Sequence, residues 1–117
     1  QQTLFNAREE VLNVYMNDAV EQYIVQLVLA SRKPGRFSEK LKRWLRFGAS
    51  PRATIALDRC AKAHAWLQRR DHVLPEDIHA VIFEVLRHRL ILSFEAEAEG
   101  ITSDDVVRLI MEHIALP

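Results

Sequence analysis

The amino-acid sequence predicts an all-α fold, a compact multi-helix bundle of about five main helices plus one short helix. The composition favours helices, because the 117 residues include only 3 glycines and 4 prolines and are rich in alanine, leucine, arginine and glutamate. Apolar side chains recur at the spacing of amphipathic helices, and no segment gives a convincing sheet pattern. A chain of this length can bury a core of its own, so we expect residues 1–117 to form one domain.

The first third of the chain predicts two helices. The first is expected around residues 7–13, with Asn6 as its cap, and a short extended link follows at 14–16. Asn17 caps the second helix, which ends at residues 33–35, where a proline and a glycine interrupt it. The apolar stripe of this second helix consists of Val20, Tyr23, Ile24, Leu27 and Val28.

A short basic helix is expected next, capped by Ser38 and ended by Gly48. Its apolar face consists of Phe37, Leu41, Trp44 and Leu45. Its basic side chains, which point away from that face, are Lys40, Lys42, Arg43 and Arg46.

A long helix is predicted from Pro51 to about Gln68, rich in alanines that allow another helix to approach closely. Cys60, the single cysteine, falls within it and is interpreted as a small core residue. The residues offered for packing are Ile55, Ala56, Cys60, Ala63 and Leu67.

Two further helices complete the prediction. Pro75 opens the first, with Glu76 and Asp77 in its first turn, where the helix dipole favours acids. Its buried stripe is Ile78, Val81, Ile82, Val85 and Leu86. The conformation of residues 89–94 is left open. The segment 102–105 has the form of a capping box for the last helix. That helix buries Val106, Val107, Ile110 and Ile114.

The net charge is zero, but the charges are unevenly distributed. Eight cations fall within residues 32–52, against Glu39 alone, whereas the stretch after Glu84 is acidic. Such an uneven distribution indicates either contact with an anion or a partner, or a solvated face.

One arginine lies where helix electrostatics does not favour it. In the segment 48–53 (GASPRA), Ser50 is expected to be the N-cap and Pro51 the first helical residue. Arg52 then lies in the first turn, at the positive end of the helix dipole. A helix N-terminus beside an arginine is a candidate phosphate receptor. The alternative is an exposed arginine that costs a few tenths of a kcal/mol.

Three segments in order, 48–53 (GASPRA), 69–78 (RRDHVLPEDI) and 85–90 (VLRHRL), closely resemble the C-terminal region of MoxR-type AAA+ ATPases. In that family this region is the helical lid that closes over the nucleotide. The chain departs from the family pattern at Arg69, where a glycine is expected, so the long helix either runs on or ends without a left-handed glycine. It departs again at Leu74, where a threonine or serine usually precedes the proline, so the Pro75 helix is expected to lack a side-chain N-cap.

The resemblance implies that Arg52 is the sensor-2 arginine, which approaches the ATP phosphates, with Ser50 shaping the approach. It makes Tyr23, Ile24 and Ala53 candidates for adenine contacts; the alternative for each is a plain core residue. His88 lies in the third of these segments, and we expect it to have a structural role, fixing the turn after the Pro75 helix by hydrogen bonds.

No phosphate-binding loop occurs in the sequence, and no apolar strand ends in paired acids that could hold Mg²⁺. We therefore expect this chain to be the lid of an ATPase whose core, with its Mg²⁺, lies upstream, and to hydrolyse no ATP alone. The resemblance implies a cytoplasmic, bacterial parent that forms a ring, commonly a hexamer. The lid then contacts its own core and neighbouring subunits, and the parent acts as a chaperone that matures or remodels client protein complexes.

Other classes of function find less support. The five histidines form no pair with metal-ligand spacing, and no nucleophile elbow indicates a hydrolytic triad. No stretch is apolar enough for a membrane span, no signal peptide occurs, and one cysteine fits a reducing cytosol. Two alternatives stay open: a stand-alone helical interaction module, and a helical nucleic-acid-binding domain that uses residues 32–52, with Trp44 and Phe47 near the apolar stripe.

Overall fold

Five long helices dominate the computed structural model, which describes residues 2–117 and the side chains from residue 6 onward. They are α1 (Gln2–Leu12), α2 (Asp18–Arg32), α4 (Arg52–Leu67), α5 (Pro75–Leu86) and α7 (Ser103–His113). The shorter elements are the 3₁₀ turn η1 (Pro34–Arg36), helices α3 (Glu39–Trp44) and α6 (Phe94–Ala98), and strands β1 (Leu45–Phe47) and β2 (Ile91–Leu92). The predicted all-α class is confirmed.

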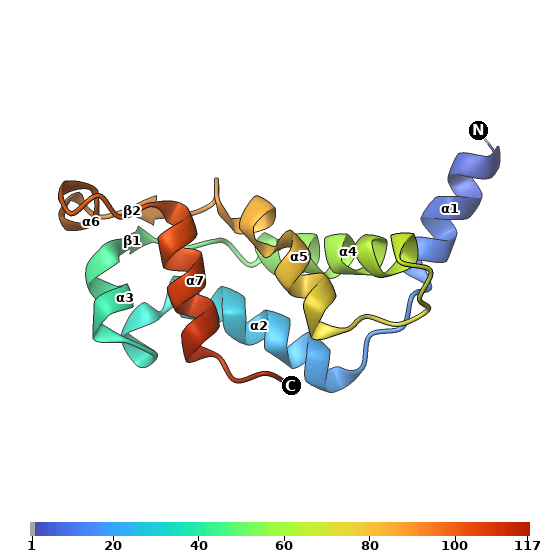
Figure 1. Cartoon of the computed structure of the whole chain (residues 1–117), viewed down its shortest axis with the longest axis horizontal. Helices are drawn as coiled ribbons and strands as arrows, with labels where there is room; N and C mark the ends of the chain where they lie inside the picture. The colour runs from blue at the N-terminus through green and yellow to red at the C-terminus, as the bar shows by residue number, and fades with distance from the viewer. Residues whose placement is uncertain (1) are drawn as a thin grey trace.

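The N-terminal helix begins earlier than predicted. Asn6 lies inside α1 rather than at its start, because no proline or glycine interrupts residues 2–12. The helix projects from one end of the molecule, which measures 50 × 29 × 21 Å (Figure 1). The extended link after it is confirmed: Tyr15 forms a parallel bridge with His72, with amide-to-carbonyl bonds of 2.8 Å from Tyr15 to Asp71 and from Val73 to Tyr15.

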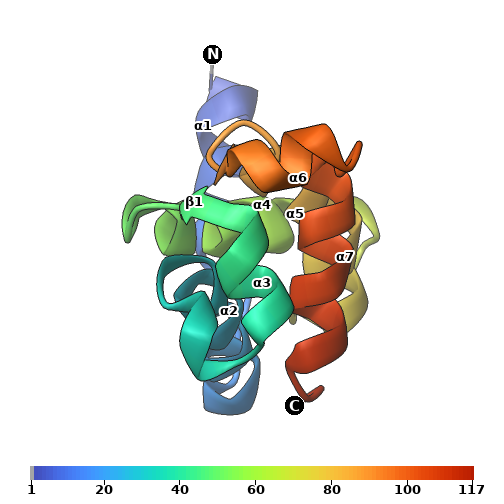
Figure 2. The ribbon, with the colours of Figure 1, turned by 90° about the vertical axis from the view of Figure 1, so that its left-hand side faces the viewer.

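Helix α2 is formed as predicted. The Asn17 side chain accepts a hydrogen bond from the Val20 amide at 2.9 Å, and the whole predicted stripe is buried. Helices α4 and α7, the turn η1 and strand β1 contact α2, and α5 meets it where Tyr23 contacts His79 (Figures 1 and 2). The largest fully buried side chains include Ile24, Leu27, Leu41, Leu57, Ile78, Ile82, Leu86 and Ile110.

The basic helix is shorter than predicted. Ser38 caps it and Leu41, Trp44 and Leu45 are buried, but it ends at Trp44 rather than at Gly48. Residues 45–47 form β1, which pairs antiparallel with β2, so the segment left open in the sequence supplies the partner strand. The four-residue spacing of Leu41 and Leu45 fits a helix. An extended backbone also buries Leu45, however, and residues 45–47 gain hydrogen bonds to β2 that a helix would not provide.

The predicted packing face of α4 is wrong. The buried residues are Ala53, Leu57, Ala61 and Ala65, whereas Ile55 is 55% exposed, Leu67 is 70% exposed and Cys60 is exposed. Ala56 and Ala63 are half-buried. The small side chains form the contact because α5 packs closely against α4, and only the alanine row permits that approach.

The last helices follow the prediction more closely. In α5 the stripe is buried except for half-buried Val81. The capping box of α7 is confirmed: Thr102 Oγ1 accepts from the Asp105 amide at 3.2 Å, and the Asp105 carboxylate accepts from the Thr102 amide at 2.9 Å. The four predicted residues of α7 and its end are buried: Val106, Val107, Ile110 and Ile114.

Candidate functional site

The candidate site is the turn between β1 and α4, residues 48–53, which carries Arg52. Two alanines anchor the turn in the core, because Ala49 is 1% exposed and Ala53 is 0% exposed. Ser50, Pro51 and Arg52, which lie between them, are all exposed. The sequence therefore fixes the backbone on both sides and leaves three side chains at the surface.

The helix start differs in detail from the prediction. Helix α4 begins at Arg52 with Pro51 as its N-cap, and no side-chain cap is formed. Ser50 contributes its carbonyl instead of its hydroxyl: it accepts from the Ala53 amide at 2.9 Å, and the Pro51 carbonyl accepts from Thr54 at 3.1 Å. Since Pro51 adopts helical backbone angles, a tight backbone turn replaces the side-chain cap.

Arg52 has no local anion. The first turn of α4 contains no acidic residue, and within the described part of the chain no ion pair or side-chain hydrogen bond involves Arg52. A guanidinium at the positive end of a helix dipole is unfavourable until an anion meets it. The local electrostatics therefore suits a phosphate arriving from outside the chain.

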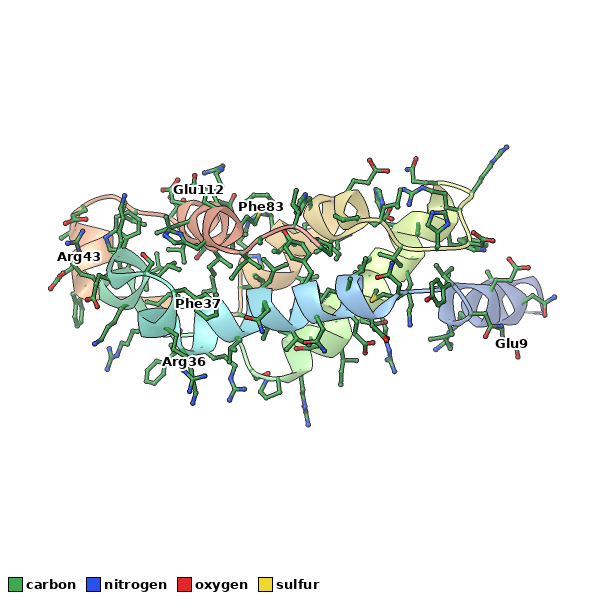
Figure 3. All side chains as sticks on the ribbon, turned by 90° about the horizontal axis from the view of Figure 1, so that it is seen from below. Glu9, Arg36, Phe37, Arg43, Phe83 and Glu112 are labelled. Carbon is green, nitrogen blue, oxygen red and sulfur yellow. The ribbon has the colours of Figure 1, made fainter. Side chains whose placement is uncertain are left out.

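A basic surface lies at the end of the molecule opposite α1, over the end of α2, η1, α3 and β1. Its exposed cations are Arg32, Lys33, Arg36, Lys40, Lys42, Arg43 and Arg46. Figure 3 shows Arg36 and Arg43 projecting from this end. Of these cations, only Arg43 forms an ion pair with a described acid, Glu95 at 3.8 Å. Trp44 is buried and donates its indole N–H to Glu99, so it offers no exposed ring face for a base; Phe47 is exposed.

The three residues predicted to contact adenine are buried. Ile24 and Ala53 lie in the core, and Tyr23 is 3% exposed. The Tyr23 hydroxyl is 2.7 Å from His79 Nε2, and the rings meet edge to face with centroids 5.8 Å apart. Burial raises the pKa of Tyr23 and lowers the pKa of His79. In this arrangement the three side chains lie in the core beneath the exposed surface of α2 and α4, and a direct contact with adenine stays a prediction.

A buried carboxylate holds the far end of α4, and sequence reasoning missed it. Asp77 is 0% exposed and accepts hydrogen bonds from both terminal nitrogens of Arg70, from His64 Nδ1 at 2.6 Å and from the Leu74 amide at 2.7 Å. Burial raises the pKa of Asp77, but the bonds from Arg70, Leu74 and His64 outweigh it and hold that pKa below its usual value. The available signal was an acid at the third helical position of α5, seven residues after an arginine with which it can pair.

Helix α4 ends without a glycine, as one of the two expected alternatives had it. Arg69 takes a left-handed conformation with φ of 62°, although a glycine is usual there. The Arg69 amide donates to the Trp66 carbonyl at 2.9 Å and the Arg70 amide to the Ala65 carbonyl at 3.0 Å. This pair of bonds is a Schellman motif, so the helix ends as a glycine would end it. Leu74 supplies no side-chain cap to α5, as its departure from the family pattern predicted.

The turn after α5 is fixed by arginines rather than by histidine. His88 is exposed, and no side-chain hydrogen bond joins it to any described residue. Arg89 donates to the Val85 carbonyl at 2.8 Å, and Arg87 forms a forked pair with Asp104, at 2.8 and 3.1 Å. The predicted structural role of His88 is therefore wrong, because its two neighbours make the contacts instead: Arg87 joins the end of α5 to α7, and Arg89 bonds back to α5 itself.

Among the described residues, no three histidine, cysteine, aspartate or glutamate side chains gather as metal ligands would. Cys60, predicted to be a core residue, is a free and exposed thiol, because the face of α4 that carries it turns away from α5. Within the described range, none of the helices is both long and apolar enough to cross a membrane.

Comparison with known proteins agrees with this geometry. The family model of the AAA lid domain matches residues 38–110, which include the Arg52 turn and the Asp77 cluster. Chaperone MoxR1 of Mycobacterium tuberculosis is 37% identical over 97% of this chain and 30% of its own length. Protein MoxR of Methylorubrum extorquens is 38% identical over 85% of this chain and 31% of its own length.

A solved structure has the same fold. A protein from Cytophaga hutchinsonii, described as a proposed ATPase, superposes with a TM-score of 0.89 and 41% identity over 93% of this chain and 33% of its own. The chain thus spans about a third of the length of the proteins it matches. Because the family model covers most of the chain and the relatives align with nearly all of it, the chain belongs to the AAA lid domain family, with MoxR-type AAA+ proteins as its relatives.

Proposed function

We propose that residues 1–117 are the nucleotide-sensing lid of a MoxR-like AAA+ ATPase and that Arg52 is its sensor-2 arginine. The carrying observation is an exposed guanidinium in the first turn of α4, beside no acid, on a backbone anchored by two buried alanines. Such a side chain gains the most when a phosphate reaches the helix N-terminus. Ser50, exposed next to it, shapes the approach of the phosphates.

The nucleotide is ATP, and its Mg²⁺ is held by the core domain of the parent. The lid contributes the Arg52 charge and closes over the nucleotide, but the phosphate-binding loop and Mg²⁺ belong to the core domain, so this chain alone hydrolyses no ATP. We also propose that the adenine base lies against α2 and the start of α4. The burial of Tyr23, Ile24 and Ala53 favours an indirect role for them, in which they shape the exposed surface above.

We extend the proposal to the parent protein from its relatives. A MoxR-like parent assembles as a ring in the cytoplasm, commonly a hexamer, and uses ATP to mature or remodel client protein complexes. In that ring the lid contacts its own core and the neighbouring subunit. ATP phosphates attract Arg52 and draw the lid onto the core. Small-angle scattering of the parent with and without an ATP analogue tests this closure, and identical profiles contradict it.

The sensor role is tested by ATP turnover of the full-length parent, wild type against Arg52→Ala. If Arg52 stabilises charge in the transition state, its loss lowers kcat about a hundredfold. Arg59→Ala is the matched control, because Arg59 is an exposed arginine about two turns along the same helix. Equal turnover in the wild type and Arg52→Ala overturns the sensor role and favours a helical interaction module instead.

A further inference from the structure

The last turn of α2 contains a buried serine that contacts the Arg52 turn. Ser31 is 1% exposed. Its hydroxyl donates to the Val28 carbonyl at 2.7 Å and accepts from the Ala49 amide at 3.0 Å. The second bond joins residues 18 positions apart in the sequence, and it connects the end of α2 to the segment that leads into α4. Both hydrogen-bonding capacities of this hydroxyl are therefore used.

Glycine makes the same junction possible. A Cβ atom at Gly48 would lie 1.9 Å from the carbonyl oxygen of Ser31 and 2.8 Å from the Arg32 amide nitrogen. The two backbones therefore touch at this point, and only a residue without a side chain fits. The glycine of the GASPR segment is explained by this contact, and not by the end of a helix.

The junction determines where Arg52 lies relative to α2. The Ala49 amide is held by the Ser31 hydroxyl, and Ala53, in the first turn of α4, is buried in the core. Only three residues separate these two fixed points, and one of them is Pro51, whose ring fixes its φ angle. The backbone of Arg52 therefore has little freedom, whereas its side chain is exposed and carries no ion pair with any residue described.

We propose that Ser31 is a positioning residue for Arg52, holding the arginine-bearing turn against the end of α2 so that the guanidinium meets the nucleotide phosphates. This inference rests on the proposed sensor role of Arg52. Ser31 itself touches no nucleotide in this proposal. A small displacement of a catalytic group has a large effect on rate, so loss of the Ser31–Ala49 bond lowers turnover through Arg52.

The test is a double-mutant cycle in the full-length parent, with kcat and KM for ATP measured for wild type, Ser31→Ala, Arg52→Ala and the double variant. We expect Ser31→Ala to lower kcat about tenfold when Arg52 is present and to have no further effect when it is absent. Ser31→Cys keeps the shape of the side chain but accepts hydrogen bonds weakly, so an intermediate kcat is expected.

Ser93→Ala is the matched control. The Ser93 hydroxyl makes the same two kinds of bond, donating to the Arg43 carbonyl at 2.7 Å and accepting from the Ala96 amide at 3.2 Å, but it caps α6. Its loss removes a comparable pair of bonds without contacting the Arg52 turn. We therefore expect Ser93→Ala to retain the kcat of the wild type.

The outcomes separate the two proposals. If Arg52→Ala lowers kcat but Ser31→Ala and Ser31→Cys do not, the positioning role is wrong and the sensor role stands. If Ser31→Ala lowers kcat equally with and without Arg52, Ser31 acts on the fold alone and the positioning role is again wrong. If Arg52→Ala changes nothing, the sensor role itself fails. Should Ser31→Ala not fold, the cycle is run with Ser31→Cys.

Discussion

The buried carboxylate of Asp77 gives the sharpest test of what holds this fold together. In Asp77→Asn, one carboxylate oxygen becomes an amide N–H₂ that faces an N–H of Arg70 together with either His64 Nδ1 or the Leu74 amide, depending on which oxygen is replaced. At least one former hydrogen bond is lost, because the new amide N–H₂ and the Arg70 N–H are both donors and face each other in a fully buried position. The charge that balanced Arg70 is lost as well, so we expect a loss of about 3 kcal/mol in the free energy of unfolding.

The assay is urea unfolding of the 117-residue chain, with the midpoint compared at a constant m-value. Asp71→Asn is the matched control, because Asp71 is a fully exposed acid in the same loop, paired only with half-exposed His72. Its midpoint is expected to match that of the wild type. A loss below about 1 kcal/mol for Asp77→Asn refutes the reasoning, because it means that the cluster contributes no more than an exposed pair.

The pH dependence of stability supplies a second measurement on the same variant. The pKa of Asp77 is lower in the folded chain than its ordinary value of roughly 4. The carboxylate therefore contributes its full stability above about pH 4, and the contribution falls as pH drops through the folded pKa. Wild type should lose stability more steeply than Asp77→Asn in this acidic range. Parallel curves contradict the assignment.

Further predictions follow from backbone geometry and charge. Arg69→Gly should raise the free energy of unfolding by about 0.5 to 1 kcal/mol, because glycine takes the left-handed conformation without strain. Gly100 already takes that conformation, at φ of 76°, so Gly100→Ala should lower the free energy of unfolding by about 1 kcal/mol. Thermal melts of both variants check the two signs. Gly48→Ala should cost about 3 kcal/mol in the same melts, because the added methyl meets the Ser31 carbonyl, and a cost below 1 kcal/mol contradicts the close approach. The chain should bind neither duplex nor single-stranded DNA at low salt despite the cations of residues 32–52, and salt-sensitive binding in a titration overturns that expectation.

Local signals predicted most of the fold. Three predicted caps, at Asn17, Ser38 and Thr102, form where the sequence indicates, because a capping side chain needs only its own helix, whereas those at Asn6 and Ser50 do not form. The stripe of α2 is buried as predicted, since its large apolar residues leave a single choice of face. The Arg52 turn was likewise found from a short motif and its resemblance to a family.

Three of the misses have a shared physical cause, since each depends on a partner elsewhere in the sequence. The face of α4 is chosen by α5, which needs small residues beneath it, so Ile55 is left exposed. Residues 45–47 are extended because β2 pairs with them. The burial of Asp77 depends on Arg70 and His64, and no periodic pattern signals such a cluster.

The exposure of Cys60 has a practical consequence for measuring the proposed lid closure. Cys60 is the single thiol in this sequence and lies eight residues beyond Arg52 on α4, about 12 Å along the helix axis. Because its side chain is exposed, a maleimide dye or a spin label can be attached there without disturbing the buried alanine row. A label at this position moves with the helix that carries Arg52, and its distance to a second label in the parent can be recorded in solution as nucleotide is added.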